Sequence, residues 1–138
     1  MISTARTEWS GGLKDGSGTT TLASGVATFA VNWKARSEGV DGTTTPEELL
    51  AAAHASCFSM ALAHGLAENG TPSTTISTTA RVSFVAGTGI TGIELTTSAS
   101  VEGISDADFQ KVAEETKTGC PVSAALAAVP ITLSATLG

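Results

Sequence analysis

The chain has 138 residues, 41% of them hydrophobic, and a net charge of −6 from seven Lys and Arg against thirteen Asp and Glu. This length allows one hydrophobic core but no second independent domain, so we expect a single domain over residues 1–138. An acidic chain without a basic patch is poorly suited to a phosphate backbone, which argues against nucleic acid as a partner.

The N-terminal residues, MISTARTEWS, contain no apolar run of signal-peptide length. The alanine-rich stretch over residues 51–67 is interrupted by the polar side chains of His54, Ser56, Ser59 and His64, which argues against a membrane span. We therefore expect a soluble, cytoplasmic protein with no membrane partner. Two cysteines in a reducing compartment favour a catalytic, redox-sensing or metal role over a permanent structural bridge.

The first third of the chain contains short β-type runs separated by glycines. These runs cover Ala5–Trp9, Thr19–Leu22 and Val26–Trp33. Glycine-rich breaks between such runs are typical of antiparallel hairpins, so we predict a small hairpin sheet here.

A long central helix is the clearest predicted element. Thr45, Pro46 and Glu48 supply an N-cap hydroxyl, a proline at the first helical position and a carboxylate at the third, which together form a capping box. The helix should run to about Glu68 and end at Asn69-Gly70. Apolar or small side chains lie on nearly every face, so we expect the helix to be surrounded by protein.

Two later stretches alternate between apolar and polar residues, over Thr74–Phe84 and Ile90–Glu102. This period of two predicts a long antiparallel pair with one buried face. The remaining predicted elements are a helix from Ser105 to about Thr118, a short helix that begins at Cys120-Pro121 and ends before Pro130, and a strand over Ile131–Thr136. The predicted fold class is α+β, with an antiparallel sheet packed on helices.

The two cysteines, Cys57 and Cys120, lie in different local settings. A thiol is a nucleophile only as the thiolate, and burial among apolar helix residues is expected to raise the pKa of Cys57. A nearby guanidinium held by a carboxylate would offset that burial, and Arg36 with Glu47 fits these roles. Cys120 lies at a predicted helix N-terminus, so local physics makes it the more acidic sulfur.

The segment from Arg36 through TPEELLAAAHASCFSMAL, together with GCPVSAAL, resembles the osmotically inducible protein C (OsmC) family, relatives of the organic hydroperoxide resistance proteins. His54, three residues before Cys57, is similar to the OsmC branch. The resemblance covers most of the chain. It implies an OsmC-like fold with a long central helix, an intertwined homodimer, and thiol-dependent reduction of organic or lipid hydroperoxides to alcohols without a cofactor or metal.

Carried over by position, the resemblance makes Cys57 the peroxidatic cysteine and Cys120 the resolving one. Arg36 matches the family arginine and Glu47 its carboxylate partner, with Lys34 as the other nearby cation. The implied cycle passes through a Cys57–Cys120 disulfide, which a dithiol such as a dihydrolipoyl protein reduces. Apolar residues are expected to favour bulky hydroperoxides over hydrogen peroxide, and the candidates are Leu50, Phe58, Met60 and residues contributed across a dimer.

Two other functions fit the same residues. His54 and Cys57 share a helix face and could bind a metal together with Cys120, although closely spaced CxxC pairs are missing. A redox-responsive protein that senses hydroperoxides without turnover is the second alternative. For His54 itself, a core or dimer-interface role is expected rather than a role in the site.

Overall fold

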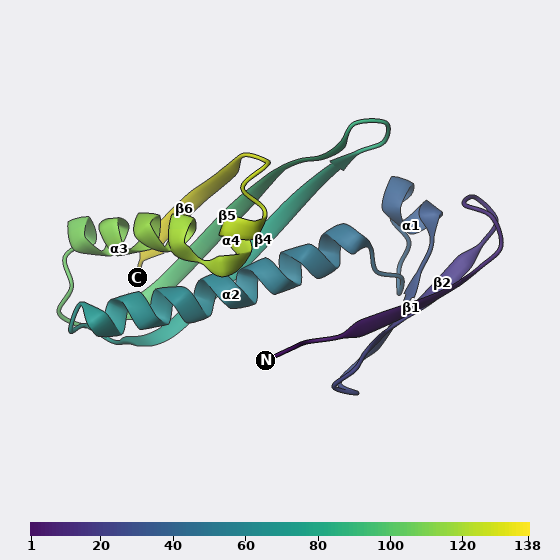
Figure 1. Ribbon diagram of the computed structural model, residues 1–138. Coiled ribbons are helices and arrows are strands. Elements are labelled where there is room, and N and C mark those ends of the chain that lie inside the picture. Colours follow the sequence, from purple (N-terminus) through teal and green to yellow (C-terminus); the bar gives the residue numbers. More distant parts are fainter. The chain divides into compact units, whose positions relative to one another are not determined.

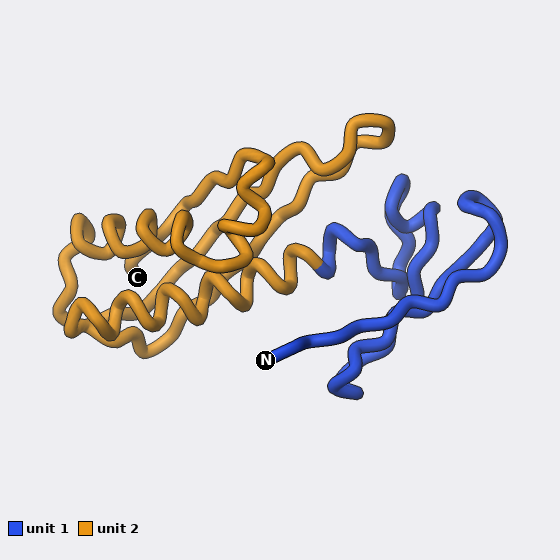
Figure 2. Tube along the Cα trace, viewed as in Figure 1, with its two compact units in different colours: residues 1–49 blue, residues 50–138 orange.

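The computed structural model describes residues Met1–Gly138, which form two compact units, Met1–Leu49 and Leu50–Gly138 (Figure 2). Unit 1 contains β1 (Ala5–Ser10), β2 (Ser17–Leu22), β3 (Thr28–Val31) and α1 (Trp33–Glu38), and α2 (Pro46–Glu68) begins there and continues into unit 2 (Figure 1). Unit 2 adds β4 (Ser73–Val85), β5 (Gly89–Val101), α3 (Asp106–Gly119), α4 (Pro121–Ala125) and β6 (Ile131–Leu137). The predicted α+β class is confirmed.

Unit 1 is built on the antiparallel sheet β1-β2-β3, as the hairpin pattern predicted. Trp9 of β1 lies directly opposite Gly18 of β2. A Cβ at Gly18 would come within 2.9 Å of Trp9 Cε3, so the glycine lets the indole lie close over the strand. Ala35 is the only buried hydrophobic residue of this unit, which therefore has no apolar core of its own.

Helix α1 replaces the end of the third predicted strand. The strand over Val26–Trp33 was expected to continue through Trp33, but β3 ends at Val31 and the helix begins two residues later. The Asn32 side chain accepts a hydrogen bond from the backbone N–H of Ala35 at 2.7 Å, which caps the new helix. Gly39, with φ of +79°, ends it.

Helix α2 has the predicted bounds. The backbone N–H of Glu48 donates to Thr45 Oγ1 at 3.0 Å, and Gly70, with φ of +79°, follows the last turn. By length and composition it is the one helix apolar enough to cross a membrane. Its buried side chains follow an i, i+4 spacing: His54, Phe58, Leu62 and Leu66. The opposite face is open, so the expectation that protein surrounds the helix does not hold within one chain.

Sheet β4-β5-β6 carries the core of unit 2. β4 and β5 pair antiparallel as predicted, with Thr78 opposite Thr97 and Ala80 opposite Leu95. β6 instead joins β5 in parallel, so the expectation of an antiparallel sheet is wrong at this strand. The physical reason is the connection: α3 and α4 cross over the sheet between β5 and β6, and such a helical crossover returns the chain in the same direction.

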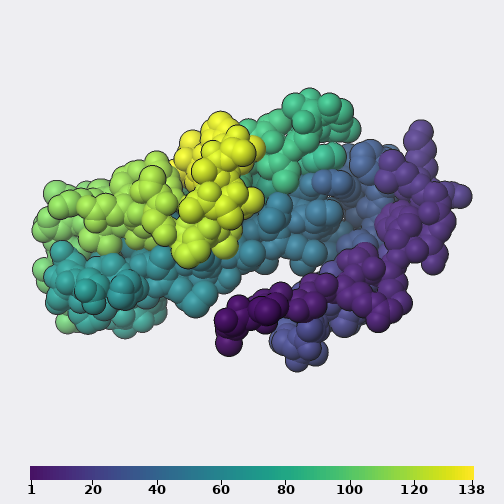
Figure 3. Space-filling view, viewed as in Figure 1, coloured from purple at the N-terminus to yellow at the C-terminus, as the bar shows by residue number.

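Two helices cover this sheet. α2 and α3 lie side by side, and the green α3 rests against the teal C-terminal half of α2 (Figures 1 and 3). A Cβ at Gly65 of α2 would lie 3.0 Å from Val112 Cγ1 of α3, so the glycine permits this close approach. Ser59 Oγ donates to Thr78 Oγ1 at 2.8 Å and ties α2 to the sheet.

Candidate active site

The two cysteines meet inside unit 2. Cys57 projects from the middle of α2, and Cys120 occupies the N-cap position of α4. Both thiols are free, and Cys120 Sγ lies 3.0 Å from Cys57 Sγ, within hydrogen-bond distance. This contact is about 1 Å longer than a disulfide bond, so oxidation requires little movement. Cys120 is fully buried and Cys57 is half-buried.

The surroundings of the two sulfurs shift their pKa values in opposite directions. Burial raises the pKa of Cys57, and the hydrogen bond with Cys120 raises it further. Burial also acts to raise the pKa of Cys120, but hydrogen bonds from Cys57, from the Ser123 backbone and side chain and from the Val122 backbone outweigh it and lower the pKa. Within unit 2 the thiolate is therefore favoured on Cys120, in the direction that local physics predicted.

His54 and Ser123 form a buried pair beside the thiols. His54 Nε2 lies 2.7 Å from Ser123 Oγ, and the exposed fractions of the two residues are 0% and 3%. Burial lowers the pKa of His54, so its imidazole is neutral. The core role expected for His54 agrees with this position. Ser123 was not identified from the sequence. The signal that could have indicated it is its position three residues after Cys120, in GCPVSAAL.

Arg36 and Glu47 form an ion pair inside unit 1. Arg36 Nη2 lies 2.7 Å from Glu47 Oε1, and Arg36 Nε lies 3.0 Å from Oε1 and 3.3 Å from Oε2. The Glu47 side chain is 7% exposed and that of Arg36 is 32% exposed. Lys34 is exposed, and the carboxylate contact goes to Arg36. Helix α1 positions the arginine, and the first turn of α2 positions the glutamate.

An apolar pocket of about 330 Å³ lies beside Arg36 in unit 1. Both tryptophans of the chain, Trp9 and Trp33, line it together with Leu13 and Leu49. These residues were not identified from the sequence, because their convergence depends on how the sheet and α1 fold.

Leu50, Phe58 and Met60, the apolar residues expected around the substrate, do not line the pocket beside Arg36. Phe58 is fully buried in the core of unit 2, and Met60 is 68% exposed. The i, i+4 spacing explains the difference, because Phe58 shares its face of α2 with His54 and Met60 does not.

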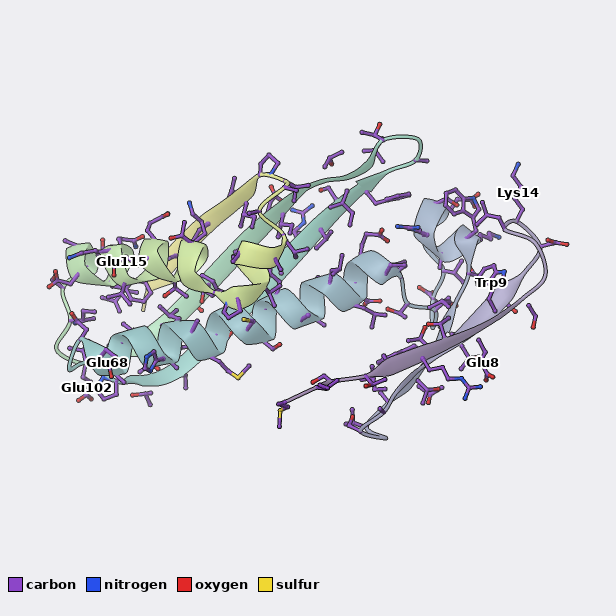
Figure 4. The ribbon with its side chains drawn as sticks, viewed as in Figure 1. Glu8, Trp9, Lys14, Glu68, Glu102 and Glu115 are labelled. Atoms are coloured by element: carbon purple, nitrogen blue, oxygen red, sulfur yellow. The ribbon has the colours of Figure 1, made fainter.

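A second, larger groove of about 590 Å³ lies in unit 2 and is bordered by Cys120. Ala61 and Gly65 of α2 and Val112 of α3 form apolar parts of its wall. Glu68 and Glu115, labelled in Figure 4, give the same groove an acidic border. Cys120 thus contributes to the wall of this groove as well as contacting Cys57.

The structure contains no cluster of ligands for the alternative metal site. No group of three or more His, Cys, Asp or Glu side chains is arranged to hold a metal ion. The Nε2 atom of the His54 imidazole is hydrogen-bonded to Ser123.

Comparison with known proteins gives consistent matches. The family model described as OsmC-like protein matches residues 38–134. The peroxiredoxin OsmC of Escherichia coli strain K12 is 45% identical over 124 residues, which are 87% of this chain and 86% of that protein.

Solved structures match over nearly their whole length. An organic hydroperoxide resistance protein OsmC from Legionella pneumophila has a TM-score of 0.69 at 21% identity, with 98% and 96% of the two chains covered. The organic hydroperoxide resistance protein OhrB of Bacillus subtilis has a TM-score of 0.63 at 27% identity, with 98% of each chain covered. These matches confirm the OsmC-like fold that the two cysteine motifs indicated, and the chain belongs to the OsmC-like family.

Proposed function

We propose that this chain is a peroxidase that reduces organic hydroperoxides to alcohols through Cys57 and Cys120. The observation that carries the proposal is the 3.0 Å contact between two free thiols 63 positions apart in the sequence. The name of the relative at 45% identity, peroxiredoxin OsmC, supports the same chemistry.

The cycle has three steps. The Cys57 thiolate attacks the terminal peroxide oxygen, the O–O bond breaks, and the alkoxide takes a proton and leaves as an alcohol, while Cys57 becomes a sulfenic acid. The Cys120 thiolate then attacks the Cys57 sulfur, and hydroxide leaves and is protonated to water. A dithiol reductant such as a dihydrolipoyl group finally attacks the disulfide and is itself oxidised to a disulfide, which returns both protein thiols.

The first step needs a cation near Cys57, because the residues of unit 2 raise the pKa of that thiol. Arg36 with Glu47 is our candidate, since a guanidinium held by a buried carboxylate stabilises a thiolate and hydrogen-bonds to peroxide oxygens. Glu47 and Cys57 are ten residues apart on α2, about 15 Å of helical rise. We therefore propose that Arg36 of one copy serves Cys57 of a second copy in a homodimer.

The apolar pocket beside Arg36 suggests the substrate class. The Arg36 guanidinium would bind the peroxide group, while Trp9, Leu13 and Trp33 would bury the organic part of the substrate. A hydrogen peroxide molecule has no apolar group to bury there. We propose alkyl or lipid hydroperoxides as the preferred substrates.

Two further properties belong to this proposal. The two units would work together as one OsmC-like domain, since solved relatives match nearly the whole chain. The protein would act in the cytoplasm, where a reducing environment keeps the thiols of Cys57 and Cys120 free.

Intact-mass spectrometry of the reduced protein tests the proposal. With about one equivalent of cumene hydroperoxide, we expect the loss of two hydrogens, mapped by peptide analysis to a Cys57–Cys120 disulfide. Dihydrolipoamide should reverse it over repeated cycles. The same titration with hydrogen peroxide should be slower.

The outcomes separate the alternatives. If Cys57 stays a free thiol under excess cumene hydroperoxide, the peroxidase proposal fails. A disulfide that forms once and is not recycled by any dithiol would instead favour the redox-responsive protein without turnover. Ser134→Ala, a change at an exposed residue of β6, serves as the control and should behave like the unmodified chain.

A further inference from the structure

The His54–Ser123 pair has no place in the cycle described above, yet Ser123 lies three residues after Cys120, which begins α4. Ser123 Oγ is 2.7 Å from His54 Nε2, and the Ser123 side chain helps to lower the pKa of Cys120. His54, Ser123 and Cys120 thus lie near one another in the interior of unit 2. All three are at least 97% buried, so water does not compete for these contacts.

The direction of the hydrogen bonds follows from counting protons. A serine hydroxyl has one proton, and it cannot donate to the sulfur and to the imidazole at once. When that proton points at the Cys120 sulfur, His54 Nε2 must carry the hydrogen and donate to Ser123 Oγ. The other ring nitrogen, Nδ1, is buried with no hydrogen-bond partner. The tautomer with its hydrogen on Nε2 leaves Nδ1 unprotonated and so avoids a buried N–H group without an acceptor. This tautomer therefore fits the site.

We propose that His54 is a positioning residue whose Nε2–H holds the Ser123 hydroxyl with its proton directed at the Cys120 sulfur, which makes Cys120 the better leaving group when a dithiol opens the disulfide. This rests on the two-cysteine cycle proposed above. In that step the attacking thiolate bonds to Cys57, the S–S bond breaks, and its electron pair leaves on Cys120. The Ser123 hydroxyl stabilises the new thiolate, and a more stable leaving thiolate departs faster.

Other titratable groups near Cys120 do not supply this effect. Cys57 contacts its sulfur directly. Glu68, Glu115 and His64 border the groove that Cys120 lines. The two carboxylates oppose a thiolate, and His64 is exposed and solvent-screened. The backbone N–H groups of Val122 and Ser123 also favour the thiolate, but they do not depend on His54.

The test measures the pKa of Cys120 in a Cys57→Ser background, where it is the only thiol, from the ultraviolet absorbance of the thiolate. His54→Phe and Ser123→Ala should each raise this pKa by about one pH unit, a tenfold loss of thiolate relative to thiol. The double variant should shift no further than either change alone. His54→Gln, which keeps an N–H donor, should restore the value. His64→Gln is the matched control and should change nothing.

A second readout concerns the leaving-group role. In the chain with both cysteines, the disulfide is formed with diamide and then reduced by dithiothreitol. His54→Phe and Ser123→Ala should slow this reduction by roughly three- to tenfold. Because no peroxide is used, these results are independent of peroxidase activity, which the mass-spectrometric titration tests separately.

Three results would overturn the inference: an unchanged Cys120 pKa in folded His54→Phe, two shifts that add in the double variant, or an unchanged rate of disulfide reduction. If circular dichroism shows that His54→Phe is unfolded, His54→Met replaces it with a flexible apolar side chain and the same expected shift. Ser123→Ala removes a single oxygen atom and tests the same contact independently.

Discussion

At the scale of single residues, the two thiols share one hydrogen bond but differ in their environments. Cys57 has little to stabilise a negative charge apart from the Val122 backbone, whereas Cys120 has donors from α4. Thiols this close titrate as a pair, and the first proton lost comes mainly from Cys120. In the proposed cycle, these donors suit Cys120 to resolution and recycling, and we expect attack by Cys57 to need a cation near its sulfur.

Cys120→Ser separates the first chemical step from the later ones. Without a resolving thiol, the variant should consume about one equivalent of cumene hydroperoxide and stop as a sulfenic acid, because no disulfide can form. Excess peroxide should then add further oxygen atoms to Cys57. Intact-mass spectrometry checks each state, and a sulfenic-acid trapping reagent confirms the first.

Cys57→Ser is the matched control and should consume no peroxide. If Cys120→Ser turned over indefinitely with dihydrolipoamide, the reductant would be resolving the sulfenic acid directly, and Cys120 would have no role in resolution.

The burial of His54 should make the free energy of unfolding depend on pH. Burial lowers its pKa from the ordinary value of 6.5, so the folded chain keeps the imidazole neutral while the unfolded chain binds a proton below about pH 6.5. The free energy of unfolding should therefore fall as pH drops below that value, by up to about 1.4 kcal/mol per pH unit, until the folded pKa is reached. Urea unfolding between pH 7.5 and about pH 5 measures the slope.

His54→Gln should remove this contribution and flatten the curve. His64→Gln, at an exposed position on the same helix, should keep the original slope. Equal slopes in all three proteins would show that His54 does not couple proton binding to folding.

The sequence was sufficient to select the reacting residues but not their supporting contacts. Cys57 with Cys120, and Arg36 with Glu47, are paired in the structure as the motifs suggested. Their roles in catalysis remain predictions. Ser123 was not identified, because nothing in the local sequence indicates that a buried imidazole 69 positions away will reach its hydroxyl.

At the scale of helices and strands, prediction was accurate where the signal was local. Caps at Thr45 and Ser105 fixed the starts of α2 and α3, since each hydroxyl accepts from the backbone N–H three residues ahead. The Asn32 cap of α1 was a signal of the same kind, hidden by the β-type residues before it. The parallel pairing of β6 could not be predicted from alternation, which is the same in parallel and antiparallel strands.

The contact between α2 and α3 depends on the missing side chain of Gly65. Gly65→Val would place a methyl-bearing Cβ against Val112 Cγ1, which lies 3.0 Å from the ideal Cβ position, and would overpack the interface. We expect a loss of roughly 1–3 kcal/mol in the free energy of unfolding, measured with urea.

Ala67→Val introduces the same side chain on the exposed face of α2, two residues further on. Its cost should stay within about 0.7 kcal/mol, the range of helix propensity alone. Equal effects of the two substitutions would mean that α3 moves freely away from α2. A partial rescue of Gly65→Val by Val112→Ala would identify the clash directly.

At the scale of the whole molecule, the distribution of buried residues is uneven. The apolar core cluster belongs to unit 2, whereas unit 1 buries only Thr20, Ala35 and Glu47. All six residues of β1 are exposed, including Trp9, which is 42% exposed. A sheet with so little burial is marginal by itself, so we expect a second copy of the chain to cover it. Light scattering should give twice the 13.7 kDa of one chain.

Mixing two inactive variants tests whether the active site is shared between copies. Arg36→Ala and Cys57→Ser should each be inactive alone, because one lacks the cation and the other the nucleophile. In a mixed dimer, the intact Arg36 of the Cys57→Ser copy can serve the intact Cys57 of the other copy. After mild unfolding and joint refolding at equal amounts, half of the dimers are mixed and each has one complete site, so about a quarter of the unmodified activity should return.

The same mixture gives a different result if Arg36 serves Cys57 within its own chain. No copy then carries both residues, and activity stays at the level of the separate variants. Joint refolding of Arg36→Ala with the double variant Arg36→Ala, Cys57→Ser is the control, because no intact Arg36 is present and no site can form in either arrangement. Recovery in the first mixture and none in the control would require the guanidinium and the thiol to come from different copies, as we proposed from the ten-residue separation of Glu47 and Cys57 along α2.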